Sequence, residues 1–307
     1  MAKRDKRIPG RYNSLFELGI DFNKLRRARL AKVQREMAAR DIGALLLTDT
    51  ISIRYVTGVS VMPLWTQANL AHYVMVPVEG SPTIFEYPNS QFVAEQFWTQ
   101  VRPAYYWQAR FTDQFAAESS DQWAAEIKGV LKEWGVADAK VGIDRLDYHG
   151  FNALQQLDVK LTDGDDPLQA ARIIKTPEEI ELLRLSAAVA EVALYDLEQT
   201  IRPGVTENEL LATYWHSMLR QGGDWCFTRL IASGYKTNPW FHEAGSKMVR
   251  PGDLVGIDTD MIGPEGYVCD ISRTFLCGDK ATSVQKEAYQ IAYDFVHQVI
   301  ELCRVGT

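Results

Sequence analysis

Three aspartates stand close together in one predicted β-hairpin, where their carboxylates are candidates for metal chemistry. Asp258 and Asp260 lie two residues apart in the apolar run 254–262, so strand alternation predicts that both side chains point to one face. The turn at 263–266 reverses the chain, and the return strand carries Asp270. Like charges held together in a half-buried sheet repel one another, and a divalent metal ion between them would offset that repulsion. The alternative is a hairpin whose acids simply face solvent.

The elements that would position this hairpin form an α+β arrangement. A capping-box pattern at 176–179 predicts the start of a helix that ends near residue 200, and a second pattern at 206–209 opens another helix. These helices are followed by a predicted strand (227–233), a loop (234–245), the acidic hairpin and a last helix (283–303).

The first half of the chain alternates helical and strand patterns, which is typical of a small α/β domain. Asp21 is a predicted helix cap, and a buried strand at 44–47 follows that helix. The polar, glycine-containing segment 163–166 is the predicted boundary between the two halves. The sequence thus predicts an N-terminal arm (1–20), an α/β domain (21–165) and an α+β domain (166–307).

The composition is that of a water-soluble globular protein and excludes several classes of partner. The 307 residues include 33 basic and 40 acidic side chains, a net charge of −7, which argues against binding to nucleic acid or to an anionic membrane. The sequence contains neither a secretory signal pattern nor a membrane-spanning apolar segment. The four cysteines show no CxxC pairing, so we expect them to be reduced and the protein to be cytoplasmic.

Several fragments of the chain together resemble the pita-bread metalloenzyme superfamily, which contains Xaa-Pro aminopeptidases, prolidases, methionine aminopeptidases and creatinase. The fragments are RIIK (172–175), PEEI (177–180), RPGVTE (202–207), His242, RPGD (250–253) and GYVCDISRTF (266–275). The resemblance implies a creatinase-like α/β N-terminal domain followed by an α+β pita-bread catalytic domain. It also implies a homodimer.

A narrower resemblance is to the bacterial dimethylsulfoniopropionate lyases built on the same fold. It is carried by the additional aspartate Asp260, the Leu64-Trp65 pair and the segment ASGYKTNPWF (232–241). Those lyases release dimethyl sulfide and acrylate. In the common peptidase pattern a pair of small residues follows the first metal-binding aspartate, and the Thr259-Asp260-Met261 sequence departs from that pattern.

The resemblance implies metal ligands at Asp258, Asp260 and Asp270, which would bind two divalent ions of Mn, Fe, Co or Zn. His242 occupies the loop in which family peptidases carry a histidine that contacts substrate or relays a proton, and is our predicted catalytic residue. The predicted substrate-binding residues are Trp65, Tyr235 and Trp240, whose aromatic faces suit a sulfonium or quaternary cation. The alternative for these aromatic residues is ordinary packing in the core.

The resemblance also implies a histidine and two glutamates that complete the metal site well beyond the second aspartate. Only His297 follows Asp270, and it lies in an apolar helical pattern. We therefore expect an incomplete catalytic domain that holds half of a metal site. The expected function is a metal-dependent hydrolase of a dipeptide or small amide. The alternatives are a dimethylsulfoniopropionate lyase and an inactive fragment.

Overall fold

The computed structural model describes residues 19–306, so the predicted N-terminal arm (1–20) lies outside the described residues except for its last two positions. The chain divides into two compact units at the boundary between Glu181 and Leu182. Each unit is built around its own set of buried apolar side chains.

The N-terminal unit contains a mixed sheet in the strand order β4-β3-β2-β1-β5-β6. Central strand β1 pairs in parallel with β5 and antiparallel with β2. Every residue of β2 and β3 is buried, as expected for strands that are covered on both faces. The strands are β1 (Ile42–Leu47), β2 (Tyr73–Pro77), β3 (Thr83–Glu86), β4 (Val101–Pro103), β5 (Lys140–Ile143) and β6 (Lys160–Asp163).

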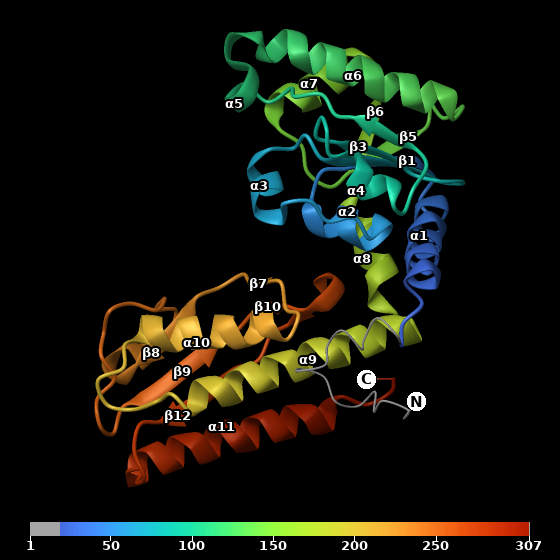
Figure 1. Cartoon of the computed structure of the whole chain (residues 1–307). Helices are drawn as coiled ribbons and strands as arrows, with labels where there is room; N and C mark the ends of the chain where they lie inside the picture. Colours follow the sequence, from blue (N-terminus) through green and yellow to red (C-terminus); the bar gives the residue numbers. More distant parts are fainter. Residues whose placement is uncertain (1–18, 307) are drawn as a thin grey trace, which may run out of the picture. The chain divides into compact units, whose positions relative to one another are not determined.

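Helices cover both faces of this sheet, with α6 and α7 on one side and α1, α2 and α8 on the other (Figure 1). The predicted cap is confirmed, because the Asp21 carboxylate accepts from the Lys24 amide at 2.9 Å. The helices are α1 (Phe22–Ala38), α2 (Thr50–Thr57), α3 (Pro63–Ala68), α4 (Gln91–Glu95), α5 (Ala109–Thr112), α6 (Ala116–Glu133), α7 (Tyr148–Gln156) and α8 (Asp165–Ile173).

The second unit contains two small sheets, in the orders β12-β9-β8 and β11-β10-β7. Its strands are β7 (Trp225–Cys226), β8 (Leu230–Ser233), β9 (Leu254–Asp258), β10 (Met261–Ile262), β11 (Val268–Cys269) and β12 (Ser272–Leu276). Its helices are α9 (Pro177–Glu198), whose residues before Leu182 belong to the N-terminal unit, α10 (Glu207–Arg220) and α11 (Ser283–Leu302). Both predicted capping boxes are present, at Thr176 with Glu179 and at Thr206 with Glu209.

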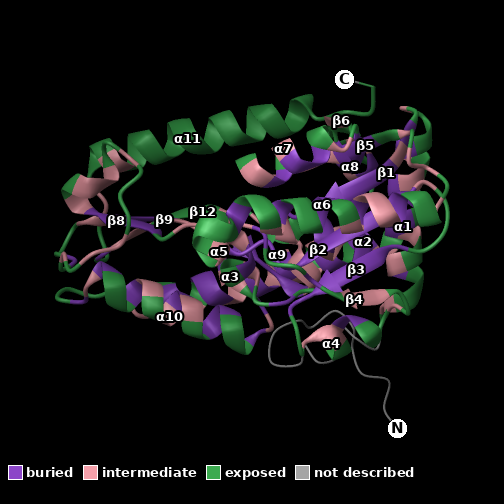
Figure 2. Cartoon of the chain, turned by 90° about the horizontal axis from the view of Figure 1, so that it is seen from above, coloured by how far each residue is buried: buried purple, intermediate pink, exposed green. Residues whose placement is uncertain are grey.

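The two faces of strand β9 have different surroundings. Val255 and Ile257 belong to the buried core together with side chains of α9 and α10. Because successive side chains alternate, Gly256 and Asp258 lie on the opposite face. Helix α11 contains no buried residue and is exposed along its whole length (Figure 2).

The prediction of one continuous acidic hairpin is wrong in detail. Strand β9 ends at Asp258, and the chain then enters the other sheet as β10 at Met261. The return strand is divided in the same way between β11 and β12. The ladder changes partners at this point because β10 pairs with β7 while β9 pairs with β8. Asp260 and Asp270 therefore lie in the bends between strands and not within one regular ladder.

Candidate functional site

Asp258 lies at the end of β9, where neighbouring strands hold it on both sides. It is opposite Ser272 on β12 and Leu230 on β8. The Ser272 hydroxyl donates a hydrogen bond of 2.7 Å to Asp258 Oδ1. The strand pairing and this hydrogen bond together orient the carboxylate on the face that α9 and α10 do not cover.

The pKa of Asp270 responds to the charges of the other two aspartates. Partial burial is the largest cause that raises the pKa of this carboxyl above its ordinary value. The negative charges of Asp258 and Asp260 raise the pKa further, as does a hydrogen bond with Asp258. The charges of both Asp258 and Asp260 therefore act on the Asp270 carboxyl.

Two thiols beside the aspartates stay protonated at neutral pH. Burial, and then the charge of Asp260, raise the pKa of Cys226 to about 12. Burial also raises the pKa of Cys269 to about 11, with a further contribution from Asp270. Burial thus favours the protonated form of both thiols.

The aspartates offer the type of ligand atom that a divalent cation binds, but they do not complete its coordination shell. Carboxylate oxygens suit Mn, Fe, Co and Zn, and a cation would offset the repulsion that acts on Asp270. Within residues 19–306, no group of three or more His, Cys, Asp or Glu side chains has an arrangement that could hold a metal ion. The carboxylates are therefore candidate ligands that need further donors.

An aromatic loop, residues 234–249, leads from β8 toward β9. The ring of Trp240 packs over Gly256, where an added Cβ would lie 2.8 Å from the ring. Gly256 lies two residues before Asp258 and on the same face, so Trp240 lies on the side of β9 that carries Asp258. Tyr235 and His242 are exposed on this loop. The Lys247 ammonium lies over the Tyr235 ring, 5.6 Å from the ring centre, in a cation–π contact.

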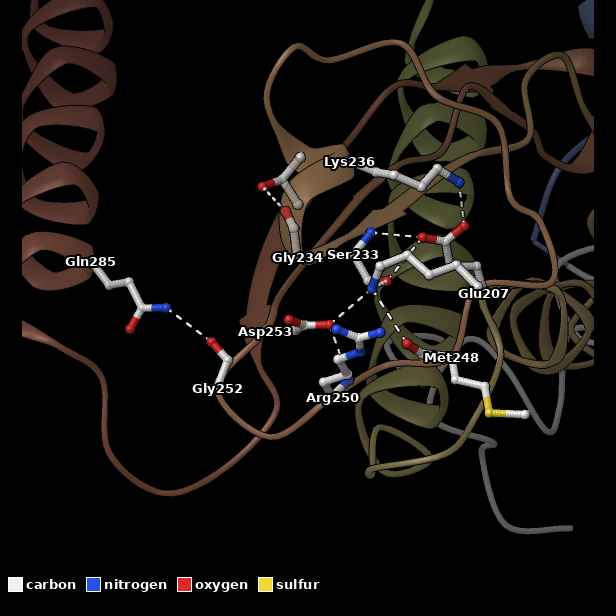
Figure 3. Close-up of polar contacts among 11 residues, drawn as sticks. Glu207, Ser233, Gly234, Lys236, Met248, Arg250, Gly252, Asp253 and Gln285 are labelled. Carbon is white, nitrogen blue, oxygen red and sulfur yellow. Dashed lines mark hydrogen bonds and ion pairs between the residues drawn. The ribbon is translucent and has the colours of Figure 1, made fainter.

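A buried carboxylate fastens the base of the aromatic loop (Figure 3). Glu207, in the first turn of α10, is fully buried. Its Oε1 accepts from the Ser233 amide and hydroxyl, both at 2.9 Å, and its Oε2 accepts from the Gly245 amide at 3.2 Å. The Lys236 ammonium forms an ion pair with the same carboxylate.

A second ion pair extends this network. The Lys247 ammonium lies 2.7 Å from Ser233 Oγ and 2.9 Å from an Asp253 oxygen. Asp253 in turn accepts from the Arg250 amide at 3.0 Å, at the start of the turn that leads into β9 (Figure 3). The loop and the strand that carries Asp258 are therefore joined by one continuous set of polar contacts.

Trp65, the remaining predicted binding residue, lies on α3 in the N-terminal unit. Its ring is half exposed and meets Phe111 edge-on, with 5.9 Å between ring centres. Sequence reasoning missed Ser272, Gly256 and Glu207 as residues of the site. Ser272 had a weak signal in its position next to the acidic bend, whereas nothing in the capping pattern showed that the Glu207 side chain points inward.

Matches to two protein families define the class of protein. The family model of the creatinase/prolidase N-terminal domain matches residues 29–174, and that of metallopeptidase family M24 matches residues 181–307. The chain belongs to the pita-bread metalloenzyme superfamily, and the expected order of a creatinase-like α/β domain followed by an α+β domain is confirmed.

Among curated proteins, the chain is similar to dimethylsulfoniopropionate lyases. It is 29% identical over 300 residues to DddP of Roseovarius nubinhibens, which covers 93% of this chain and 66% of the lyase. It is 31% identical over 291 residues to DddP of Roseobacter denitrificans, which covers 91% of this chain and 63% of the lyase. The chain therefore spans about two thirds of the length of these lyases.

The chain is also similar to peptidases. An Xaa-Pro dipeptidase of Pyrococcus furiosus is 32% identical over 143 residues, which is 46% of this chain and 40% of the dipeptidase. The crystal structure of the prolidase of Pyrococcus horikoshii matches with a TM-score of 0.68 at 24% identity, covering 87% of this chain and 69% of the prolidase chain. This structural match shows a shared fold. Within residues 19–306, no helix has the combination of length and apolar character required to cross a membrane.

Proposed function

We propose that this chain acts in carbon–sulfur bond cleavage, as a lyase that releases dimethyl sulfide and acrylate from dimethylsulfoniopropionate. One observation carries this proposal. The similarity to the DddP lyases runs through both domains, over 93% and 91% of the chain, whereas the similarity to the Pyrococcus furiosus dipeptidase covers 46%. The sequence alone favoured a hydrolase over a lyase. The extent of these matches supports the lyase as the first candidate.

The aspartates are the proposed metal ligands. Asp258, Asp260 and Asp270 would supply carboxylate oxygens to divalent ions of Mn, Fe, Co or Zn, together with donors beyond this trio. A bound cation would supply a positive charge that holds the substrate carboxylate. Ser272 would keep the Asp258 carboxylate oriented through its hydrogen bond of 2.7 Å.

The aromatic loop is the proposed substrate-binding element. The Trp240 ring beside the acids offers a face for the sulfonium group of the substrate. In the elimination, a base removes a proton from the carbon next to the carboxylate, and the carbon–sulfur bond breaks with its electron pair leaving on sulfur. We assign the proton transfer to His242, which is exposed on the same loop.

A second candidate function is hydrolysis of Xaa-Pro dipeptides. It is favoured by the 32% identity to the Pyrococcus furiosus dipeptidase over 143 residues. In that reaction the same carboxylates would hold ions that act on an amide carbonyl.

One preparation tests both candidates. The purified chain is incubated with dimethylsulfoniopropionate and with a panel of Xaa-Pro dipeptides, each with added Mn²⁺, Fe²⁺, Co²⁺ or Zn²⁺. Headspace gas chromatography measures dimethyl sulfide, and amino-acid analysis measures free proline. We expect dimethyl sulfide that disappears in the Asp258→Asn variant. Release of proline without dimethyl sulfide would establish the second candidate, and the absence of both products would contradict the two proposals for this chain.

A further inference from the structure

We propose that Glu207 is a positioning residue, whose buried carboxylate holds the aromatic loop (234–249) closed against the acid-bearing face of β9. The proposal deepens the proposed function, because this loop carries Tyr235, Trp240 and His242. The role of Glu207 in loop closure rests only on contacts within the second unit.

The contacts of Glu207 reach both ends of the loop. Ser233 and Lys236 stand where the loop begins, and Gly245 stands where it returns. The carboxylate is completely buried and receives donors on both oxygens. Charge-assisted hydrogen bonds in such a place are stronger than neutral ones, and removing one partner leaves the others buried without an acceptor.

The far side of the loop is held by packing. The Trp240 ring lies over Gly256, on the strand that ends at Asp258. The loop is thus held through the Glu207 carboxylate at its base, through the Trp240 ring over β9, and through the contacts of Lys247 with Ser233 and Asp253. The return of the loop is also held by backbone hydrogen bonds, from the Ala244 amide to the Arg229 carbonyl at 2.8 Å and from the Asn208 amide to the Gly245 carbonyl at 3.0 Å. Loss of the carboxylate contacts should therefore loosen mainly the first part of the loop, which carries the Trp240 ring.

Glutamine cannot replace Glu207 here, although its shape is nearly the same. A glutamine side chain has one acceptor oxygen and an NH₂ group with two donors. Its NH₂ would face either the Ser233 donors or the Gly245 amide and Lys236 ammonium, so donors would meet donors. In the second orientation, Lys236 would keep only its hydrogen bond of 3.1 Å to the Glu243 carbonyl.

Glu209 provides a matched control on the same helical turn. Its carboxylate is exposed and accepts from the Thr206 amide and hydroxyl, both at 2.8 Å, within the capping box. The hydrogen bonds of this side chain stay within the helix cap and do not involve the loop. Glu209→Gln therefore makes the same chemical change without touching the loop.

Hydrogen–deuterium exchange with mass spectrometry on the full 307-residue chain tests the proposal. In Glu207→Gln and Lys236→Met, we expect amides in 234–245 to exchange at least about tenfold faster, while peptides from 210–220 and from the N-terminal unit keep their rates. Glu209→Gln should match the wild type. Wild-type exchange at 234–245 in Glu207→Gln would overturn the proposal, as would a uniform increase across residues 182–306, which would show a merely structural role.

Kinetics give the functional side of the same test. If the chain is an active lyase, Glu207→Gln should raise KM for dimethylsulfoniopropionate with little change in kcat. The closed loop would form in a smaller fraction of molecules, so substrate would bind more weakly, whereas the bound substrate would react at the normal rate once the loop is closed. An equal loss in kcat at unchanged KM would overturn the positioning role. Exchange is measured without turnover, so a failure of the lyase proposal leaves the result on loop closure intact.

Discussion

The aspartates show, at the level of single residues, why a binding site can destabilise the fold that contains it. Burial, and then repulsion from the charges of Asp258 and Asp260, raise the pKa of Asp270. Within the chain itself nothing is gained by placing three negative charges there. Their position is consistent with selection for binding a positive ion, since groups that serve function often reduce stability.

This repulsion predicts that Asp270→Asn stabilises the metal-free chain. The substitution removes one of the like charges and keeps the shape of the side chain. Because Asp270 is exposed to solvent, we expect a gain below about 1 kcal/mol in the free energy of unfolding. Urea unfolding in the presence of EDTA measures this gain. Mn²⁺ should stabilise the wild type more than the variant, and a loss of stability without metal would contradict the explanation.

Asp144 predicts a pH dependence in the N-terminal unit. Burial raises its pKa to about 6, although it accepts hydrogen bonds from the amides of Thr48, Asp49 and Arg145. An acid whose pKa is raised by folding binds more protons in the folded state. The free energy of unfolding should therefore fall as pH rises from about 4 to about 6, by on the order of 3 kcal/mol for this group.

The matched variants for this prediction are Asp144→Asn and Asp158→Asn. The first removes the titrating group, so the fall in stability attributed to Asp144 should disappear from urea unfolding curves recorded between pH 4 and pH 7. Asp158 is exposed and has a positive φ of 56°, a conformation that asparagine tolerates. Its substitution should leave the dependence of the free energy of unfolding on pH unchanged. Equal slopes in all three proteins would contradict the role of Asp144.

At the level of elements, local signals in the sequence predicted helices well and the acidic hairpin only in part. The predicted capping boxes at Thr176 and Thr206 mark the starts of α9 and α10 because capping depends on residues three positions apart. The division of the hairpin between two sheets depends on pairing with β7 and β8, which lie far earlier in the chain. No local pattern contains that information.

The candidate site was predictable to a similar extent. The three aspartates were predicted from their type and spacing, because acids in an apolar hairpin stand out. The inward direction of Glu207 and the contact between Trp240 and Gly256 were not found, since each depends on segments that meet only in the folded unit. The packing of Trp240 also shows why a glycine within a strand can signal a close approach.

The contact of Trp240 with β9 predicts the effect of Gly256→Ala. A Cβ at this position would lie 2.8 Å from the Trp240 ring, so the ring must move or the strand must bend. We expect a loss of about 1–3 kcal/mol in stability and faster amide exchange in the aromatic loop. Gly129→Ala in α6 is the control, because nothing lies within 4 Å of the added carbon. That change should stabilise the chain by about 0.5–1 kcal/mol.

At the scale of the whole molecule, the two units differ in how completely they bury their apolar side chains. The N-terminal unit has the larger core, which includes the stacked rings of Trp107 and Trp123 with 4.4 Å between their centres. The second unit has a smaller core, and its helix α11 buries no residue. Since burial of apolar surface is the main source of stability, the N-terminal unit should be the more stable of the two.

Two separate cores predict two unfolding transitions in calorimetry, with the second unit unfolding at the lower temperature. Leu154 and Leu197 are fully buried, the first in the N-terminal core and the second in the core of the other unit. Leu197→Ala should lower only the first transition and Leu154→Ala only the second, each by about 2–5 kcal/mol of unfolding free energy. One transition that shifts equally in both variants would mean that the units unfold together, and their stabilities could then not be assigned to separate cores.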